Sequence, residues 1–353
     1  MKKHFLFFIF IIFNQNSFAS FSYVASKFLT SNDFTDEEGN VSGHYVWTSS
    51  SKNPFTELIL SWNALRPERG KFVFLVSVKH NKWTQWYKLA EWGVKSQQTF
   101  VNSRVPIVHA KHVRMVLTRG KKSSAFRIKV LAQNGADLRN LKSLFVNTCD
   151  MNKFVETKPD FKKMTTYIKG FPRQSQMVVG HPRFRDICSP TSLSMILDYY
   201  LNPKRLTPKV GGLTSFVASF ADLVHDDSYL DIYGNWILNT AQVFDSSQGS
   251  VFCRAQRLNN FDELYEYLKN KTPVAVSIRG SLRGGRKPYD NGHFVVVIGW
   301  SQKKKAVICV DPAFSSSNKT LKAYPVKDFL TAWGKSRNLS YIAIHKNDFY
   351  KIM

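Results

Sequence analysis

Between residues 20 and 150, hydrophobic positions form short runs that are broken by turn residues. In one run Leu58, Leu60 and Trp62 recur at every second position, as in a strand with one buried face. The runs predicted to be strands cover residues 55–62, 71–78, 83–89, 112–118 and 126–131. Short strands at roughly ten-residue spacing predict an antiparallel β-sandwich, which we assign to residues 20–133.

The hydrophobic pattern changes after residue 133. Residues 134–170 contain Asn134-Gly135, a lysine-rich stretch and Pro159, and they are predicted to be a linker with local helix. From residue 171 to residue 353, helical and strand patterns are mixed, which indicates a second domain and an α+β protein.

The clearest helix follows Cys188. Leu193, Ile196, Leu197 and Tyr200 repeat at helical spacing and give one buried stripe. The helix is predicted to start at Pro190, which suits a first helical position, and an Asn-Pro pair at 202–203 ends it. A second short helix is predicted at 261–268, and buried strands are predicted at 273–278, 294–300, 306–310 and 341–344.

The first 19 residues have the pattern of a secretory signal peptide. Lys2 and Lys3 precede an apolar run at 5–13, and Ser17-Phe18-Ala19 resembles a cleavage site. We therefore expect cleavage after Ala19 and a secreted or periplasmic protein. No apolar run approaches the roughly 20 residues of a membrane-spanning helix, so no transmembrane segment is expected.

The chain is strongly basic. Its 353 residues include 50 Lys and Arg against 25 Asp and Glu, for a net charge of +25, and the excess is spread over both halves. Such a charge favours acidic partners. The chain has no zinc-finger spacing and no RNA-binding aromatic signature, so specific nucleic-acid binding is not expected.

The predicted β-sandwich is rich in tryptophan, with Trp47, Trp62, Trp83, Trp86 and Trp92. One hypothesis is that residues 20–150 fold alone and bind an anionic envelope polymer or a glycan. The alternative is that these tryptophans belong to the core.

Four cysteines, Cys149, Cys188, Cys253 and Cys309, are expected in an oxidising compartment, where disulfides are possible and their pairing is not readable. A Cys188–Cys309 disulfide is the alternative that would remove a reactive thiol at position 188. Because the sequence has neither a C-x-x-C pair nor H-E-x-x-H, we expect no metal site and no cofactor.

Cys188 lies at the start of a predicted helix, a position typical of nucleophilic cysteines. A thiol at a helix start meets the positive end of the helix dipole, which favours thiolate. His293 opens an apolar run, and Asp311 follows the next predicted strand, so an antiparallel hairpin would place the two residues about opposite each other. Cys, His and Asp in these positions predict nucleophile, base and orienting carboxylate. The alternative is that Cys188 has only a structural role, as a buried or disulfide-bonded residue.

Five separated stretches carry a resemblance to a known family. They are Cys188-Ser189-Pro190-Thr191-Ser192, Tyr233-Gly234-Asn235-Trp236, Pro273-Val274-Ala275-Val276-Ser277-Ile278, Gly292-His293-Phe294-Val295-Val296-Val297 and Val310-Asp311-Pro312-Ala313. In this order they resemble the bacteriocin-processing, C39-like cysteine peptidases of the papain clan, and more closely a secreted branch of that group. The resemblance covers roughly residues 171–345. Residues 40–131 also resemble the β-domain that precedes the peptidase in this branch.

The resemblance implies a papain-like peptidase domain at 171–353, with Cys188 as nucleophile, His293 as general base and Asp311 as orienting carboxylate. A glutamine before the cysteine usually helps to bind the oxyanion in this family. Gln176 is the first candidate for that role and Gln174 the second. At position 189 the family usually has glycine, whereas this chain has serine.

The implied function is an exported cysteine peptidase that cleaves amide bonds of a peptide or protein through a thioester. The alternative is a catalytically silent papain-fold protein that binds a cell-surface polymer through its β-domain. The basic segment with Arg279, Arg283, Arg286 and Lys287 is expected to overhang the cleft, either selecting acidic substrate residues or as a solvated loop. Residues 233–236 could belong to the core or to the cleft wall, and the core is favoured because the cluster is aromatic.

Overall fold

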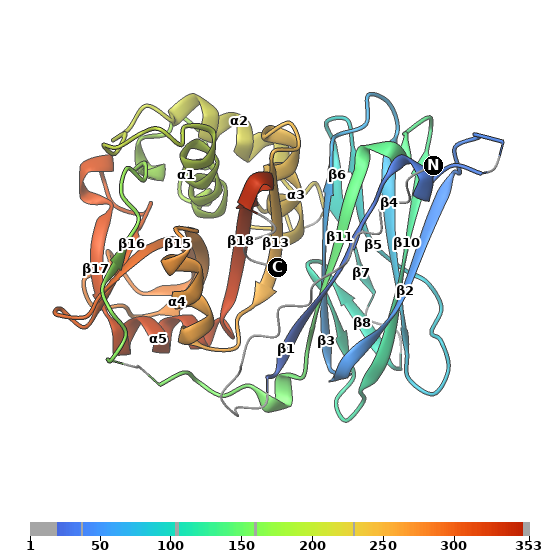
Figure 1. Cartoon of the computed structure of the whole chain (residues 1–353), viewed down its shortest axis with the longest axis horizontal. Helices are drawn as coiled ribbons and strands as arrows, with labels where there is room; N and C mark the ends of the chain where they lie inside the picture. Colours follow the sequence, from blue (N-terminus) through green and yellow to red (C-terminus); the bar gives the residue numbers. More distant parts are fainter. Residues whose placement is uncertain (1–19, 37, 103–105, 159–160, 229, 349–353) are drawn as a thin grey trace, which may run out of the picture.

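The computed structural model describes residues 20–36, 38–102, 106–158, 161–228 and 230–348, in two domains that lie side by side (Figure 1). The predicted signal peptide, residues 1–19, lies outside this range. Among the described residues, no helix combines the length and the apolar character needed to cross a membrane.

The first domain is an antiparallel β-sandwich, as predicted. One sheet has six strands in the order β1-β11-β3-β9-β8-β7, and the other has five in the order β2-β10-β4-β5-β6. The strands are β1 Ser22–Phe28, β2 His44–Phe55, β3 Glu57–Ala64, β4 Lys71–Lys79, β5 Tyr87–Gly93, β6 Gln97–Thr99, β7 Val101–Asn102, β8 Val108–Lys111, β9 Arg114–Leu117, β10 Ser123–Gln133 and β11 Leu141–Cys149.

The tryptophans of this domain divide between core and surface. Trp62 and Trp92 are fully buried and meet edge to face, with ring centroids 6.0 Å apart. Trp83 and Trp86 are half-buried, and both rings contact the guanidinium of Arg127 at 4.8 and 4.4 Å. The core alternative is therefore correct for Trp62 and Trp92.

Part of the segment predicted to be a linker is a strand of the β-sandwich. Residues 134–170 do contain a short 3-10 helix, Leu138–Asn140, but strand β11 follows it and lies between β1 and β3. The strand was hidden because both of its faces are buried, so that the polar residues Ser143 and Asn147 interrupt its apolar pattern. The β-domain therefore extends to Cys149.

The second domain packs helices against an antiparallel sheet of order β13-β18-β14-β15-β16-β17, to which β12 is added by pairing with β15. Its strands are β12 Thr166–Tyr167, β13 Val251–Arg257, β14 Val274–Gly280, β15 Tyr289–Ser301, β16 Ala306–Val310, β17 Leu321–Pro325 and β18 Leu339–His345. Its helices are α1 Cys188–Leu201, α2 Thr214–Val224, α3 Trp236–Ser246, α4 Phe261–Lys269 and α5 Val326–Lys335.

The edge strand β13 faces the β-sandwich (Figure 1). The free edge of β13 is hydrogen-bonded to side chains of β3. The backbone N–H of Cys253 donates to Asn63 Oδ1 at 2.8 Å, and that of Ala255 donates to Ser61 Oγ at 2.9 Å. Strand β3 is consequently buried on both faces, and the prediction of a half-buried strand is wrong for this reason.

Arg66 also joins the two domains. Its guanidinium lies 3.7 Å from the ring centroid of Trp92 and donates to Gln97 at 2.9 Å, both within the β-domain. The same group donates to Gln242 of α3 at 3.0 Å, while the Arg66 backbone N–H donates to Asp245 at 2.9 Å. This half-buried cation therefore fixes α3 against the β-domain.

Candidate active site

Cys188 is the first residue of α1, two residues earlier than the predicted helix start. The predicted stripe of Leu193, Ile196 and Leu197 is fully buried, and α1 packs against β15. This packing fixes the start of the helix, and with it the thiol, beside the sheet. N–H groups in the first turn of a helix have no acceptor within the helix, so they point positive charge at this position.

His293 and Asp311 are brought together by strands β15 and β16, as predicted. His293 Nε2 lies 2.7 Å from Asp311 Oδ1. The register differs from the simple hairpin, because Val296 pairs with Val310 and a bulge follows between Val297 and Gly299. His293 lies inside β15 rather than at its start, since that strand begins at residue 289.

The Asp311 carboxylate is fully buried and accepts three further hydrogen bonds. The hydroxyls of Tyr289 and Tyr324 donate to Oδ2 at 2.8 and 2.6 Å, and the backbone N–H of Ala313 donates to Oδ1 at 2.9 Å. Burial alone would raise the pKa of Asp311. The charge and hydrogen bond of His293, with the donors from Tyr324 and Ala313, instead hold that pKa below its ordinary value.

Tyr289 also stacks on His293, with ring centroids 4.4 Å apart and an interplanar angle of 13°. Sequence reasoning missed both tyrosines. Tyr289 had a signal, because it precedes His293 by four residues on one strand and so shares its face. No sequence pattern indicated Tyr324, because its strand, β17, was not predicted.

The thiol of Cys188 interacts with His293. Burial alone would raise the pKa of Cys188. The hydrogen bond and charge of His293, with backbone hydrogen bonds from Phe294 and Ser189, lower it below the ordinary thiol value. Burial likewise opposes the charged form of His293, yet the charge and hydrogen bond of Asp311 and the thiol raise the pKa of His293 to about 10. Both shifts favour the charged forms, thiolate at Cys188 and imidazolium at His293.

The other three cysteines behave differently. All four are free, so the alternative of a Cys188–Cys309 disulfide is not present. Burial raises the pKa of Cys149 to about 12 and also raises the pKa values of Cys253 and Cys309. Cys188 alone has a pKa lowered below that of an ordinary thiol. Within the described residues, no group of three His, Cys, Asp or Glu side chains could hold a metal ion.

Ser189, which replaces the usual glycine, is accommodated without an unpaired hydroxyl. Its Oγ donates to Asn239 Oδ1 at 2.9 Å and lies 3.1 Å from the hydroxyl of Tyr341. The side chain is fully buried in this polar pocket behind the nucleophile.

Gln176 lies in the same cleft as Cys188. Its amide nitrogen donates to the carbonyls of Phe184 and Arg185, both at 2.9 Å, while its Oε1 is buried without a partner. An oxyanion role for Gln176 therefore requires one of these hydrogen bonds to be exchanged for one to substrate. Gln174 is fully buried and its oxygen accepts the N–H of Leu213, so it lies outside the cleft and the second choice is wrong.

The cleft around Cys188 and His293 has a volume of about 1120 Å³. Both domains line it, since Arg114 of β9 contributes from the β-sandwich. Tyr233 and Trp236 are half-buried and also line it. Both residues therefore form part of the cleft wall, the second alternative, while also packing against the core.

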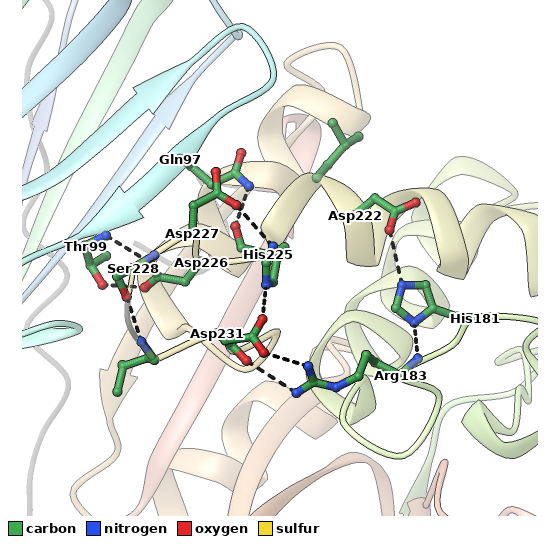
Figure 2. Close-up of polar contacts among 12 residues, drawn as sticks. Gln97, Thr99, His181, Arg183, Asp222, His225, Asp226, Asp227, Ser228 and Asp231 are labelled. Atoms are coloured by element: carbon green, nitrogen blue, oxygen red, sulfur yellow. Dashed lines mark hydrogen bonds and ion pairs between the residues drawn. The ribbon is translucent and has the colours of Figure 1, made fainter.

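The loop that carries Tyr233 is fixed by a chain of polar contacts (Figure 2). Asp231 accepts from Arg183 Nη1 at 2.8 Å and lies 2.6 Å from His225 Nε2. Asp226, in the same loop, accepts from the backbone N–H of Thr99 in the β-domain at 3.1 Å. This wall of the cleft is therefore fixed both to the segment before α1 and to the β-sandwich.

The basic segment before His293 was expected to overhang the cleft, and three of its four basic residues do line it. Arg279, Arg286 and Lys287 line the cleft. Arg283 lines a separate depression and pairs with Asp328 at 2.9 Å.

Two protein families match the chain. Residues 168–341 match the Peptidase_C39 like family, and residues 29–105 match the Peptidase C39 N-terminal domain. No curated protein matches the chain. A crystal structure described as a C39-like peptidase from Bacillus anthracis is similar, with 17% identity and a TM-score of 0.37, covering 52% of this chain and 99% of that chain. The predicted resemblance is thus confirmed: the chain belongs to the C39-like peptidase family and carries the C39 N-terminal domain in front of the peptidase domain.

Proposed function

We propose that this protein is an exported cysteine peptidase that hydrolyses amide bonds of a peptide or protein substrate. The observation that carries the proposal is the joint geometry of Cys188 and His293, which line a two-domain cleft, and of Asp311, which contacts His293. Export is proposed from the pattern of residues 1–19. Binding of an envelope polymer or glycan by the β-domain stays a prediction.

In the proposed mechanism, the Cys188 thiolate attacks the substrate carbonyl carbon. Because Nε2 of His293 bonds to Asp311, the other ring nitrogen, Nδ1, is left for the sulfur side. Nδ1–H gives its proton to the leaving amine as the C–N bond breaks, which leaves a thioester on Cys188. The neutral imidazole then takes a proton from water, and the resulting hydroxide attacks the thioester. The acid product leaves and the ion pair of Cys188 and His293 is restored.

The negative oxygen of each tetrahedral intermediate needs preorganised donors. The backbone N–H of Cys188, in the first turn of α1, is one candidate. The amide of Gln176 is the second, if it releases the carbonyl of Phe184 or Arg185. Substrate binding would supply the exchange, because the oxyanion is a stronger acceptor than a neutral carbonyl.

The test is cleavage of a mixed-sequence peptide pool by the purified protein, with products identified by mass spectrometry. Cys188→Ala is expected to lower turnover at least a thousandfold, as loss of a nucleophile does in comparable enzymes. Hydroxylamine added during turnover is expected to trap the acyl group as a hydroxamate. The matched control is Cys253→Ala, which removes a buried thiol outside the cleft. Equal cleavage by Cys188→Ala would exclude Cys188 as the nucleophile, and no cleavage by the wild type would favour the silent binding protein.

A further inference from the structure

The cleft around Cys188 has an unbalanced charge. Nine of its lining residues are Lys or Arg and three are Asp. Two of the acids, Asp186 and Asp231, are already paired with Arg183 at 2.7 and 2.8 Å. Asp290 is the remaining acid among the described lining residues.

Part of this charge comes from a buried cluster between the domains. Glu57 of β3 pairs with Arg257 of β13 at 2.6 Å and with Arg114 of β9 at 3.1 Å. Burial lowers the pKa of Arg114; Glu57 opposes that shift, and the charges of Arg257 and Arg279 add to it. Arg114 and Arg257 therefore share one carboxylate, and the charges of Arg257 and Arg279 both repel that of Arg114. An anion bound in the cleft would relieve that repulsion.

Arg279 places a positive charge close to the reacting atoms. It is exposed and follows Ile278, which pairs with His293 across β14 and β15. Its guanidinium lies over Gly292, where an added Cβ would be 3.7 Å from Nε. Lys335 lies over the same strand end: an added Cβ at Gly280 would be 2.7 Å from Nζ. Neither Arg279 nor Lys335 has an ion-pair partner among the described residues.

We propose that the cleft selects acidic peptide segments, with carboxylate side chains beside the scissile amide contacting Arg279 and Lys335. The inference rests on the proposed peptidase function, since it assigns the substrate class of that site. A guanidinium binds a carboxylate through two parallel hydrogen bonds, which gives both affinity and orientation. The aromatic wall of Tyr233 and Trp236 provides the apolar contact that a peptide also needs.

The first test uses the mixed-sequence peptide pool with wild type, Arg279→Gln and Arg283→Gln. Wild-type cleavage sites are expected to be enriched in Asp and Glu near the scissile bond. Arg279→Gln is expected to reduce kcat/KM on acidic peptides roughly fivefold relative to Glu-to-Gln versions of the same peptides, and high salt is expected to weaken the preference. Arg283→Gln is the matched control, because Arg283 lies outside the cleft and pairs with Asp328.

The second test does not depend on turnover. Iodoacetate and iodoacetamide deliver nearly the same group to Cys188, but only the first is an anion. The ratio of their alkylation rates at Cys188 is expected to fall roughly threefold to fivefold in Arg279→Gln and to be unchanged in Arg283→Gln.

The outcomes distinguish a failure of the proposed peptidase function from a failure of the proposed preference for acidic segments. Slow alkylation of Cys188 by both reagents together with absent cleavage contradicts the peptidase function, while the rate ratio still reports on the charge of the cleft. Efficient cleavage without acidic enrichment, or an unchanged ratio in Arg279→Gln, overturns the inference and leaves the peptidase function standing. Protection of Cys188 by a short DNA oligonucleotide but not by polyglutamate also overturns it, by assigning the charge to a nucleic acid.

Discussion

The ring of Tyr289 stacks on the imidazole of His293 at 4.4 Å, while the Tyr289 hydroxyl donates to Asp311, the carboxylate that the same imidazole contacts. One side chain thus fixes both the plane of the ring and the position of its partner. Burial first, and then the Asp311 charge, raise the pKa of Tyr289, so its hydroxyl stays a donor. Tyr289 is therefore a positioning residue of the proposed triad.

Tyr289→Phe and Tyr289→Leu separate these two contributions. Phe keeps the stacking and loses one hydrogen bond, for which we expect kcat to fall roughly fivefold to tenfold. Leu also loses the stacking, and a further fall in kcat is expected because the imidazole is no longer held in one plane. KM should change little in both variants. Steady-state kinetics with thermal unfolding as a control checks this, and a change confined to KM would show that Tyr289 binds substrate instead.

Asp311→Ala is expected to change the pH dependence of the reaction. The Asp311 charge raises the pKa of His293 to about 10, so the imidazolium form persists at alkaline pH in the wild type. Without that carboxylate the pKa of His293 falls, and the upper limb of the kcat/KM profile moves to lower pH. Turnover at neutral pH should fall by orders of magnitude, whereas Asp311→Asn is expected to be milder, because papain-type sites also use an amide here. An unchanged upper limb in folded Asp311→Ala would remove Asp311 from the mechanism.

Much of this site could be predicted from the sequence because its three central residues lie in or directly beside regular elements. Cys188 begins a helix with an apolar repeat at helical spacing, His293 lies on an apolar strand, and Asp311 directly follows the next apolar strand after a short polar turn. Local patterns suffice for such positions.

The rest of the site depends on contacts between distant parts of the chain. Arg114 enters the cleft only because β9 pairs with β3, which packs against β13, and nothing near residue 114 indicates this. Helix α3 was missed because two of its polar residues are buried, which hides its apolar stripe: Asn239 makes polar contacts within the second domain, and Gln242 accepts from Arg66 of the β-domain. Strands β3 and β11 were misread for the same reason, since polar side chains on one face serve a buried interface.

Gln176→Ala tests the oxyanion role. If the amide reaches the oxyanion during turnover, kcat is expected to fall roughly 100-fold to 1000-fold with little change in KM. The rate of Cys188 alkylation should be nearly unchanged, because alkylation forms no oxyanion. If kcat is unchanged and only thermal stability falls, Gln176 serves to hold the carbonyls of Phe184 and Arg185.

Asn63→Ala tests the domain interface. The substitution leaves the buried backbone N–H of Cys253 without an acceptor, and the expected loss is about 1–3 kcal/mol in the free energy of unfolding. Chemical denaturation of the whole chain measures it. Asn53→Ala is the control, because Asn53 donates to Tyr23 within the β-domain. Equal stability of Asn63→Ala and wild type would mean that β13 does not depend on this contact.

The most direct measurement for the central claim is the pH dependence of Cys188 alkylation by iodoacetamide, followed by peptide mass mapping. With its pKa lowered by His293, Cys188 is expected to react rapidly near pH 6, far below the ordinary thiol pKa of about 8.5. Its rate at that pH should fall in His293→Ala, while Cys149, Cys253 and Cys309 stay unlabelled in the folded protein because they are buried. If Cys188 titrates like an ordinary thiol, or reacts equally fast without His293, it is not an activated nucleophile and the peptidase proposal fails.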